Sequence, residues 1–165
     1  MAPRGGPIAG GTVVTVVGTG LSTVTIVHFG TARAIPVLRT ATYLRVRAPA
    51  HVAGTVLVTV TSPSGTSAST SVATYTYAAR PTITKVSPAV GSRAGGTLIT
   101  LTGTNFVGIS SVKFGGVAGT IVRVSSTMKA MIVRTPRHAP GVVAVTVAGY
   151  GGTSASVPAA RYSYR

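Results

Sequence analysis

The nine residues GGTLITLTG, from Gly95 to Gly103, recur as GGTVVTVVG from Gly10 to Gly18, 85 positions earlier in the chain. Each copy opens with two glycines, which readily take the positive φ of a tight turn. Threonine and aliphatic residues follow, and these favour extended backbone. In an extended segment Ile99 and Leu101 lie on one face, opposite their neighbours. The stretch therefore predicts a glycine turn leading into a half-buried β-strand, present twice.

The repeat extends along the whole chain. At the shift of 85 residues, Phe29-Gly30 corresponds to Phe114-Gly115. After a two-residue insertion the shift becomes 87, and Val58-Thr59-Val60 corresponds to Val145-Thr146-Val147. The other matched pairs are Gly6 with Gly91, Pro49 with Pro136, His51 with His138, Gly54 with Gly141, Gly65 with Gly152, Tyr75 with Tyr162, and Tyr77 with Tyr164. We therefore expect two homologous units, at residues 1–80 and 81–165.

Each unit consists of short runs of Val, Ile, Thr and Tyr separated by Gly and Pro, without the 3.6-residue periodicity of a helix. In the second unit we expect strands at 82–86, 97–102, 111–114, 120–124, 127–133, 142–147 and 160–164. Short strands at this density, with no helix, predict an all-β fold of two tandem immunoglobulin-like β-sandwiches. Phe29 and Phe114 are the expected core anchors.

The second unit also carries an ordered series of motifs. They are Pro81-Thr82-Ile83, Val86-Ser87-Pro88, Gly91, Gly95-Gly96-Thr97, Leu101-Thr102-Gly103-Thr104-Asn105-Phe106, Val112-Lys113-Phe114-Gly115-Gly116, Thr135-Pro136, Gly141, Val145-Thr146-Val147 and Tyr162-Ser163-Tyr164. In this order they resemble the IPT/TIG family, the immunoglobulin-like domains of plexins, transcription factors and many bacterial surface and phage proteins. The first unit resembles the family more loosely. The resemblance implies an immunoglobulin-like fold but no single activity, since members serve as spacers, adhesion modules, sugar-binding appendages and dimerisation domains.

The first unit has no counterpart of the strand that opens the second unit. Aligning Gly6 with Gly91 places Pro3 opposite Pro88, so the matching strand would need residues ahead of Met1. We expect 1–80 to be a sandwich that lacks its first strand and 81–165 to be complete. An open sheet edge invites a strand from another chain. That chain is a neighbouring subunit, through self-association, or the body to which the protein binds. The alternative is a tolerated truncation, or a sequence that has been cut short.

The chain carries 15 Lys and Arg residues and no Asp or Glu, which gives a formal net charge of +15. No side chain can therefore serve as a carboxylate base, a carboxylate metal ligand or the acid of a catalytic triad. There is no cysteine, and the three histidines are too scattered for a zinc site. No Gly-x-Ser-x-Gly, Walker or dinucleotide-binding motif is present. We expect a non-enzymatic protein with no catalytic residues, no metal and no cofactor.

Charges of one sign repel one another, and an anionic partner relieves that repulsion. In the segment 43–47, alternation places Leu44 and Val46 inward and Arg45 and Arg47 outward. The candidate residues for binding a polyanion or an acidic partner are Arg39, Arg45, Arg47, Arg123, Lys129, Arg134 and Arg137. The alternative is that these charges only keep a small sandwich soluble. His51 and His138 are expected to be exposed turn residues.

The preferred function is that of a structural and binding module that docks on an acidic surface. The preferred setting is a phage virion, as a decoration or accessory structural protein on an acidic protein lattice such as a capsid. The alternative is an extracellular or cell-surface module for adhesion or carbohydrate binding, and a DNA-binding protein ranks third. Nucleic acid and acidic glycans rank below a protein lattice; for nucleic acid, the 5% aromatic content leaves no evident stacking platform. No apolar run reaches the length of a membrane span, so no membrane insertion is expected.

Overall fold

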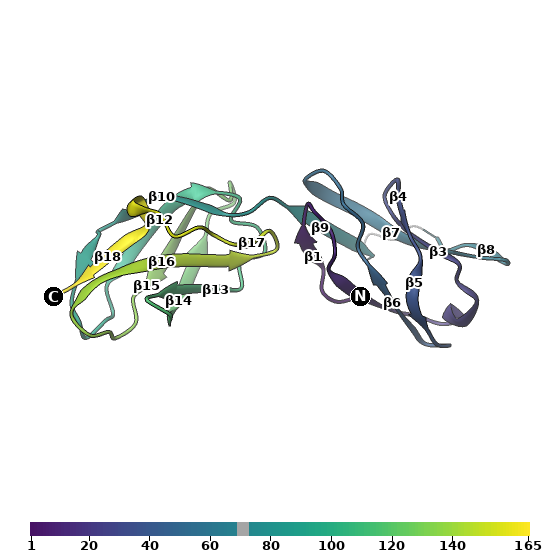
Figure 1. Cartoon of the computed structure of the whole chain (residues 1–165), viewed down its shortest axis with the longest axis horizontal. Helices are drawn as coiled ribbons and strands as arrows, with labels where there is room; N and C mark the ends of the chain where they lie inside the picture. The colour runs from purple at the N-terminus through teal and green to yellow at the C-terminus, as the bar shows by residue number, and fades with distance from the viewer. Residues whose placement is uncertain (69–72) are drawn as a thin grey trace. The chain divides into compact units, whose positions relative to one another are not determined.

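A computed structural model describes residues 1–68 and 73–165. It divides the chain into two units, Met1–Ala79 and Arg80–Arg165 (Figure 1). Among the described residues the only helices are two single-turn 3-10 helices, η1 (Leu21–Thr23) and η2 (Pro158–Ala160). Each unit is a sandwich of two packed β-layers, so the predicted all-β fold of two tandem immunoglobulin-like sandwiches is confirmed.

The second unit has one layer in the order β10, β12, β15, β14 and another in the order β11, β18, β16, β13. The first layer comprises β10 (Thr82–Ser87), β12 (Leu98–Thr104), β15 (Ala130–Arg134) and β14 (Val117–Val124). The second comprises β11 (Val90–Gly91), β18 (Arg161–Tyr164), β16 (Gly141–Gly149) and β13 (Ser111–Phe114), with β17 (Gly152–Thr153) paired to β16. The first part of β14 pairs with β13 and its second part with β15, so this strand joins the layers.

The first unit repeats this plan. Its small layer is β2 (Val13–Val17), β6 (Tyr43–Arg47) and β5 (Pro36–Arg39). Its larger layer is β1 (Gly5–Pro7), β9 (Thr74–Ala78), β7 (Gly54–Ser62), β3 (Ile26–Phe29) and β4 (Ala32–Ala34), with β8 (Gly65–Thr66) paired to β7. In both units the short strand before the Gly-Gly-Thr turn pairs in parallel with the final strand.

Both cores are built around a phenylalanine and two tyrosines. Phe114 meets Tyr162 edge to face with ring centroids 5.7 Å apart, and Phe29 meets Tyr75 in the same way at 5.3 Å. Both phenylalanines are fully buried, which confirms them as core anchors. The rings gather because alternate residues of each strand point inward, as the strict exposed–buried alternation along β12 shows.

One expected strand is wrong at its start. The prediction ran a strand from residue 127, but 126–129 form a turn and β15 begins at Ala130. Ser125 causes the turn: its hydroxyl accepts the Thr127 N–H at 3.2 Å, and its carbonyl accepts the Met128 N–H at 3.0 Å. Met128 takes a φ of 55°, which ends the extended backbone. Lys129 therefore lies in a turn and not on a strand.

The opening strand of the second unit has only a trace in the first. Ser87 of β10 pairs with Thr100 of β12. At the equivalent place, the Ala2 N–H donates to the Thr15 carbonyl at 3.0 Å, and the Thr15 N–H donates to the Ala2 carbonyl at 2.8 Å. Within the described ranges, no strand continues this pairing along residues 16–19 on that side of β2.

Gly103 and Gly18, which end the repeated stretch in the two units, differ in the atoms that lie beside them. A Cβ on Gly103 would collide with the Thr82 carbonyl, because β10 lies against it. A Cβ on Gly18 would meet only the Leu21 side chain, at an ordinary 3.5 Å. We expect Gly103→Ala to destabilise the second unit by about 1–3 kcal/mol, the range for forced overpacking. The matched variant Gly18→Ala should leave the first unit unchanged.

Amide hydrogen exchange read peptide by peptide measures each unit separately in the full chain. Equal loss of protection in the two variants, or a neutral Gly103→Ala, would show that strand contact does not distinguish these glycines.

The buried tyrosines should make the fold sensitive to alkali. Burial, and to a smaller extent the neighbouring phenols Tyr75 and Tyr162, raise the pKa of Tyr77 and Tyr164 to about 12. Because the folded pKa lies above the unfolded value of about 10, this contribution to stability is complete below about pH 10. It is lost as the pH rises from about 10 to about 12.

Urea denaturation at a series of pH values, with the near-ultraviolet absorbance of phenolate as a second signal, tests this. The double variant Tyr77→Phe with Tyr164→Phe should flatten the alkaline loss, whereas Tyr43→Phe with Tyr150→Phe, at half-buried sites, should not. Ionisation of Tyr77 and Tyr164 without any loss of stability would contradict the burial argument.

Candidate anion-binding surface

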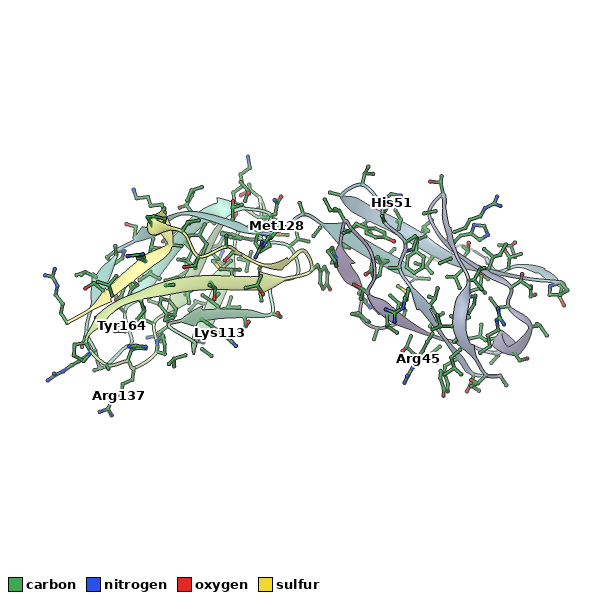
Figure 2. All side chains as sticks on the ribbon, viewed as in Figure 1. Arg45, His51, Lys113, Met128, Arg137 and Tyr164 are labelled. Atoms are coloured by element: carbon green, nitrogen blue, oxygen red, sulfur yellow. The ribbon has the colours of Figure 1, made fainter. Side chains whose placement is uncertain are left out.

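The outer face of the small layer of the first unit carries two of the predicted arginines. Along β6 the side chains alternate, with Leu44 and Val46 buried and Arg45 and Arg47 exposed, as the sequence predicted. Arg45 lies opposite Thr15 of β2 and Leu38 of β5, and Arg47 lies opposite Val13. In Figure 2 the Arg45 side chain points away from the sheet. The face therefore combines arginines with exposed aliphatic residues.

The second unit repeats one of these pairs. Arg134 occupies the repeat position of Arg47, and its neighbour Leu98 occupies that of Val13. Arg123 lies on the same outer face, opposite Ile132 of β15. Val13 and Leu98 are 41% and 50% exposed, so in both units an arginine stands beside a half-covered aliphatic side chain.

Three predicted residues lie elsewhere. A register shift in β5 between Pro36 and Leu38 offsets the strand, so Arg39 pairs with Leu44. The Leu44 side chain points into the core. Arg39 is therefore at an edge, on the side opposite Arg45. Lys129 lies in the turn before β15, and Arg137 lies in the loop between β15 and β16. The structure thus groups Arg45 with Arg47 and Arg123 with Arg134. Arg39, Lys129 and Arg137 lie apart from both pairs.

Arg137 belongs to a second cationic feature, an open hollow of about 950 Å³ at the loop end of the second unit. The hollow is lined by Arg93, Ala94, Val117, Arg137, His138, Ala139 and Pro140. These residues come from the turn before β12, the β13–β14 hairpin and the β15–β16 loop. The Arg137 side chain extends outward from its loop in Figure 2.

His138 is held rigidly at this hollow. Its ring stacks on Tyr164 with centroids 5.0 Å apart, and its backbone N–H donates to the Arg93 carbonyl at 3.0 Å. Nδ1 lies 2.9 Å from the Ala139 carbonyl, and since a carbonyl can only accept, Nδ1 carries the proton. His51 makes the equivalent contacts with Tyr77 and Val52. Both histidines are half-buried, so the prediction that they are exposed turn residues is wrong: the tyrosine ring covers one face.

The comparison of the two units also identifies Arg93, which sequence reasoning left out. The first-unit counterparts of Arg93 and Arg137 are Ile8 and Ala50, on the same backbone turn beside the same histidine. The repeat alignment carries a signal for Arg93 and Arg137, as two arginines against two neutral residues. Only the folded loops show that the two arginines lie at the same hollow.

A single family of domain models accounts for almost the whole chain. The IPT/TIG domain model matches residues 1–77 and again residues 81–164. The chain belongs to the IPT/TIG domain family. Each match covers one of the two sandwiches, so the resemblance read from the motifs is confirmed.

Two solved structures of the plexin A4 extracellular region are similar to the tandem IPT/TIG domains. One shares 22% identity over 99% of this chain and 17% of that chain, with a TM-score of 0.59. The other shares 21% identity over 99% of this chain and 15% of that chain, with a TM-score of 0.60. SGBP-B from a Bacteroides uniformis xyloglucan utilization locus shares 24% identity over 93% of this chain and 46% of that chain, with a TM-score of 0.44. This chain spans less than a fifth of the plexin chains, and the plexin likeness is one of fold. No curated protein sequence matches the chain.

The electrostatics of both IPT/TIG domains follow from the missing acids. With no Asp or Glu in the chain, neither the outer-face arginines nor those of the hollow have a side-chain counter-charge. Concave surfaces concentrate such a field, and guanidinium groups present donors that match the oxygens of phosphate, sulfate or carboxylate. Within the described ranges no group of three or more potential ligands could hold a metal ion. No helix in that part of the chain is long and apolar enough to cross a membrane.

The hollow allows a test with an internal control. Titration with inorganic sulfate should shift the ring C–H resonances of His138, because an oxyanion held by Arg93 and Arg137 lies beside that ring. His51 is the matched reference, since its own surroundings are equivalent but lack the two arginines. The double variant Arg93→Ile with Arg137→Ala, which installs the first-unit residues, should abolish the response. Equal shifts at His51 and His138 would mean that only ionic strength had changed.

Proposed function

We propose that this protein is a non-catalytic module that binds an anionic polymer at a cell surface. The observation that carries the proposal is the arginine–aliphatic pair on the outer face of each sandwich, Arg47 with Val13 and Arg134 with Leu98. The pair recurs in both units and has no counter-charge within the chain. A polymer that reaches both units gains avidity from two weak sites.

Burial of the aromatic rings favours recognition by charge. All three phenylalanines and the tyrosines Tyr75, Tyr77, Tyr162 and Tyr164 are buried in the cores. The remaining tyrosines, Tyr43 and Tyr150, are half-buried. Stacking on single-stranded bases requires exposed ring faces, and the described residues offer no fully exposed ring. The proposal therefore names an acidic polymer, and neutral sugars and single-stranded nucleic acid fit less well.

The aliphatic residues opposite Arg47 and Arg134 also favour an acidic polymer. An arginine in open water contributes little to an ion pair, often less than about 1 kcal/mol. Val13 and Leu98 lie directly opposite Arg47 and Arg134 on the neighbouring strand, a spacing at which cross-strand side chains can contact one another. Apolar surface next to a charge lowers the local dielectric and strengthens a contact with an anion.

We place the protein at the cell surface, where the tandem domain fold is also used by the extracellular region of plexin A4. The phage virion setting stays a prediction. An acidic capsid lattice would bind the same arginine faces as an anionic polymer. Duplex DNA is a further polyanion that these faces would hold through its phosphates.

The test is retention of the full chain on immobilised anionic polysaccharide, with neutral dextran as the reference matrix. The variant Arg47→Glu with Arg134→Glu should elute at lower salt and lose about tenfold or more in affinity, since each lost contact lowers the salt slope by about one. The control Arg33→Glu with Lys113→Glu makes the same change in net charge on the other layer, on β4 and β13, and should bind nearly as the parent does.

Equal weakening of both variants would show that total charge alone drives retention, and the outer-face site would be withdrawn. Retention on dextran would contradict recognition by charge. A virion role would show itself differently, as a fixed ratio of protein to purified particles with release at high salt. Binding to duplex DNA tighter than to polysaccharide would move the assignment to a nucleic acid.

A further inference from the structure

Three strands of the second unit contribute neighbouring side chains to a hollow on the outer face of its first layer. Thr100 of β12 lies opposite Ile132 of β15, and Ile132 lies opposite Arg123 of β14. The hollow has a volume of about 210 Å³. Its lining residues are Thr100, Arg123, Ser125, Ala130, Met131 and Ile132. Pockets for drug-sized ligands measure about 300–1,000 Å³, so this hollow fits one small group, such as a single ring of a polymer.

A small residue in the middle of the face accounts for this hollow. By the repeat, Ala130 is the counterpart of Tyr43 in the first unit. Tyr43 lies on the outer face of β6, because it alternates with the buried Leu44. The second unit therefore carries a methyl group where the first unit carries a phenol ring, and the space above Ala130 is left for a ligand.

An arginine and an aliphatic residue exchange strands between the two units at this place. In the first unit Arg45 on β6 stands opposite Leu38 on β5. In the second unit the equivalent positions hold Ile132 on β15 and Arg123 on β14. Cross-strand neighbours of this kind lie close enough to contact one another. Both faces therefore keep one arginine beside one aliphatic side chain, and in the second unit this pair forms part of the hollow.

The strands beneath the hollow offer no unpaired backbone to a ligand. β12 is paired with β10 on one side and with β15 on the other, and β15 is paired with β12 and β14. A peptide that binds by adding a strand to a sheet edge therefore finds no edge here. Recognition falls to side chains, which are the Arg123 guanidinium, the hydroxyls of Thr100 and Ser125, and the aliphatic groups of Ala130 and Ile132.

We propose that this hollow binds one carboxylate-bearing sugar ring, a hexuronate, of the acidic polymer. Arg123 holds the carboxylate, to which a guanidinium presents two parallel N–H donors. A sugar ring carries C–H groups beside its hydroxyls, so its C–H face packs on Ala130 and Ile132. Its hydroxyls exchange hydrogen bonds with Thr100 and Ser125. The inference rests on the proposed function and names the class of polymer, an acidic polysaccharide that contains carboxylate rings.

Sodium glucuronate is the probe, and the methyl resonances of the full chain report where it binds. The Ile132 methyls should shift and saturate, whereas the Leu38 methyls, beside Arg45 in the first unit, should shift several-fold less. Arg123→Leu should weaken binding by about tenfold or more, the usual cost of losing a hydrogen bond to a charged group. Ala130→Tyr should fill the hollow and abolish the saturable shift. Both changes install residues that the first unit carries at the equivalent positions.

Three controls separate the ring from its charge. Lys113→Leu removes one positive charge from the other layer, on β13, and should bind glucuronate as the parent does. Sodium acetate, which carries the carboxylate of an acidic peptide without a ring, should give no saturable shift at Ile132, and dimethyl phosphate should give none either. Equal shifts at Ile132 and Leu38, equal losses in Lys113→Leu and Arg123→Leu, or an acetate response equal to that of glucuronate overturns the hexuronate site. A dimethyl phosphate response equal to that of glucuronate assigns the hollow to a phosphodiester and overturns it as well.

Failure of this site is distinguishable from failure of the proposed function. The parent chain could be retained on a sulfated polysaccharide, lose that retention in the Arg47→Glu, Arg134→Glu variant, and still show no response to glucuronate. That result would overturn the hexuronate site and leave the proposed function in place.

Discussion

The packing of tyrosine against glycine organises both sandwiches. In the second unit the Tyr162 hydroxyl lies where a Gly91 side chain would be, and Tyr75 stands in the same relation to Gly6. This close approach lets β11 pair in parallel with β18, which in turn sets the turn that carries Arg93. Tyr164, one pleat further along β18, is the ring on which His138 stacks. The loop end of the unit therefore takes its shape from a contact in the core.

The positive charges lie on a fold whose stability does not depend on ion pairs between side chains. Without Asp or Glu no side-chain ion pair can join the strands, so stability rests on the apolar cores and the strand ladders. The outer-face arginines consequently have no acidic side-chain partner within the chain, although Arg47 donates to the Gly11 carbonyl at 3.5 Å. This separation explains how a small sandwich tolerates +15: the charges sit on exposed positions of alternating strands, where water screens most of their mutual repulsion.

The two units act as controls for one another. They share the Gly-Gly-Thr turn, the paired tyrosines and the stacked histidine, and two of their differences bear on the surface. The second unit places Arg93 and Arg137 where the first has Ile8 and Ala50. The first unit pairs only Ala2 with Thr15 where the second pairs Ser87 with Thr100. Duplicated domains that keep a common core are free to diverge at loops, and this divergence gives the second unit a cationic end that the first lacks.

The sequence by itself determined the two units, their all-β character, their family, the core anchors Phe29 and Phe114, and the outward direction of Arg45 and Arg47. These follow from local rules, since glycine turns and the two-residue period of a strand are written in neighbouring residues. Only the tertiary structure decided that Arg39 leaves the Arg45 face, because a register shift in β5 is a property of the pairing between strands. It also decided that Arg93, Arg137 and His138 share one hollow and that His138 is half-buried. Such proximity depends on how loops distant in sequence close around a core, which no local pattern encodes.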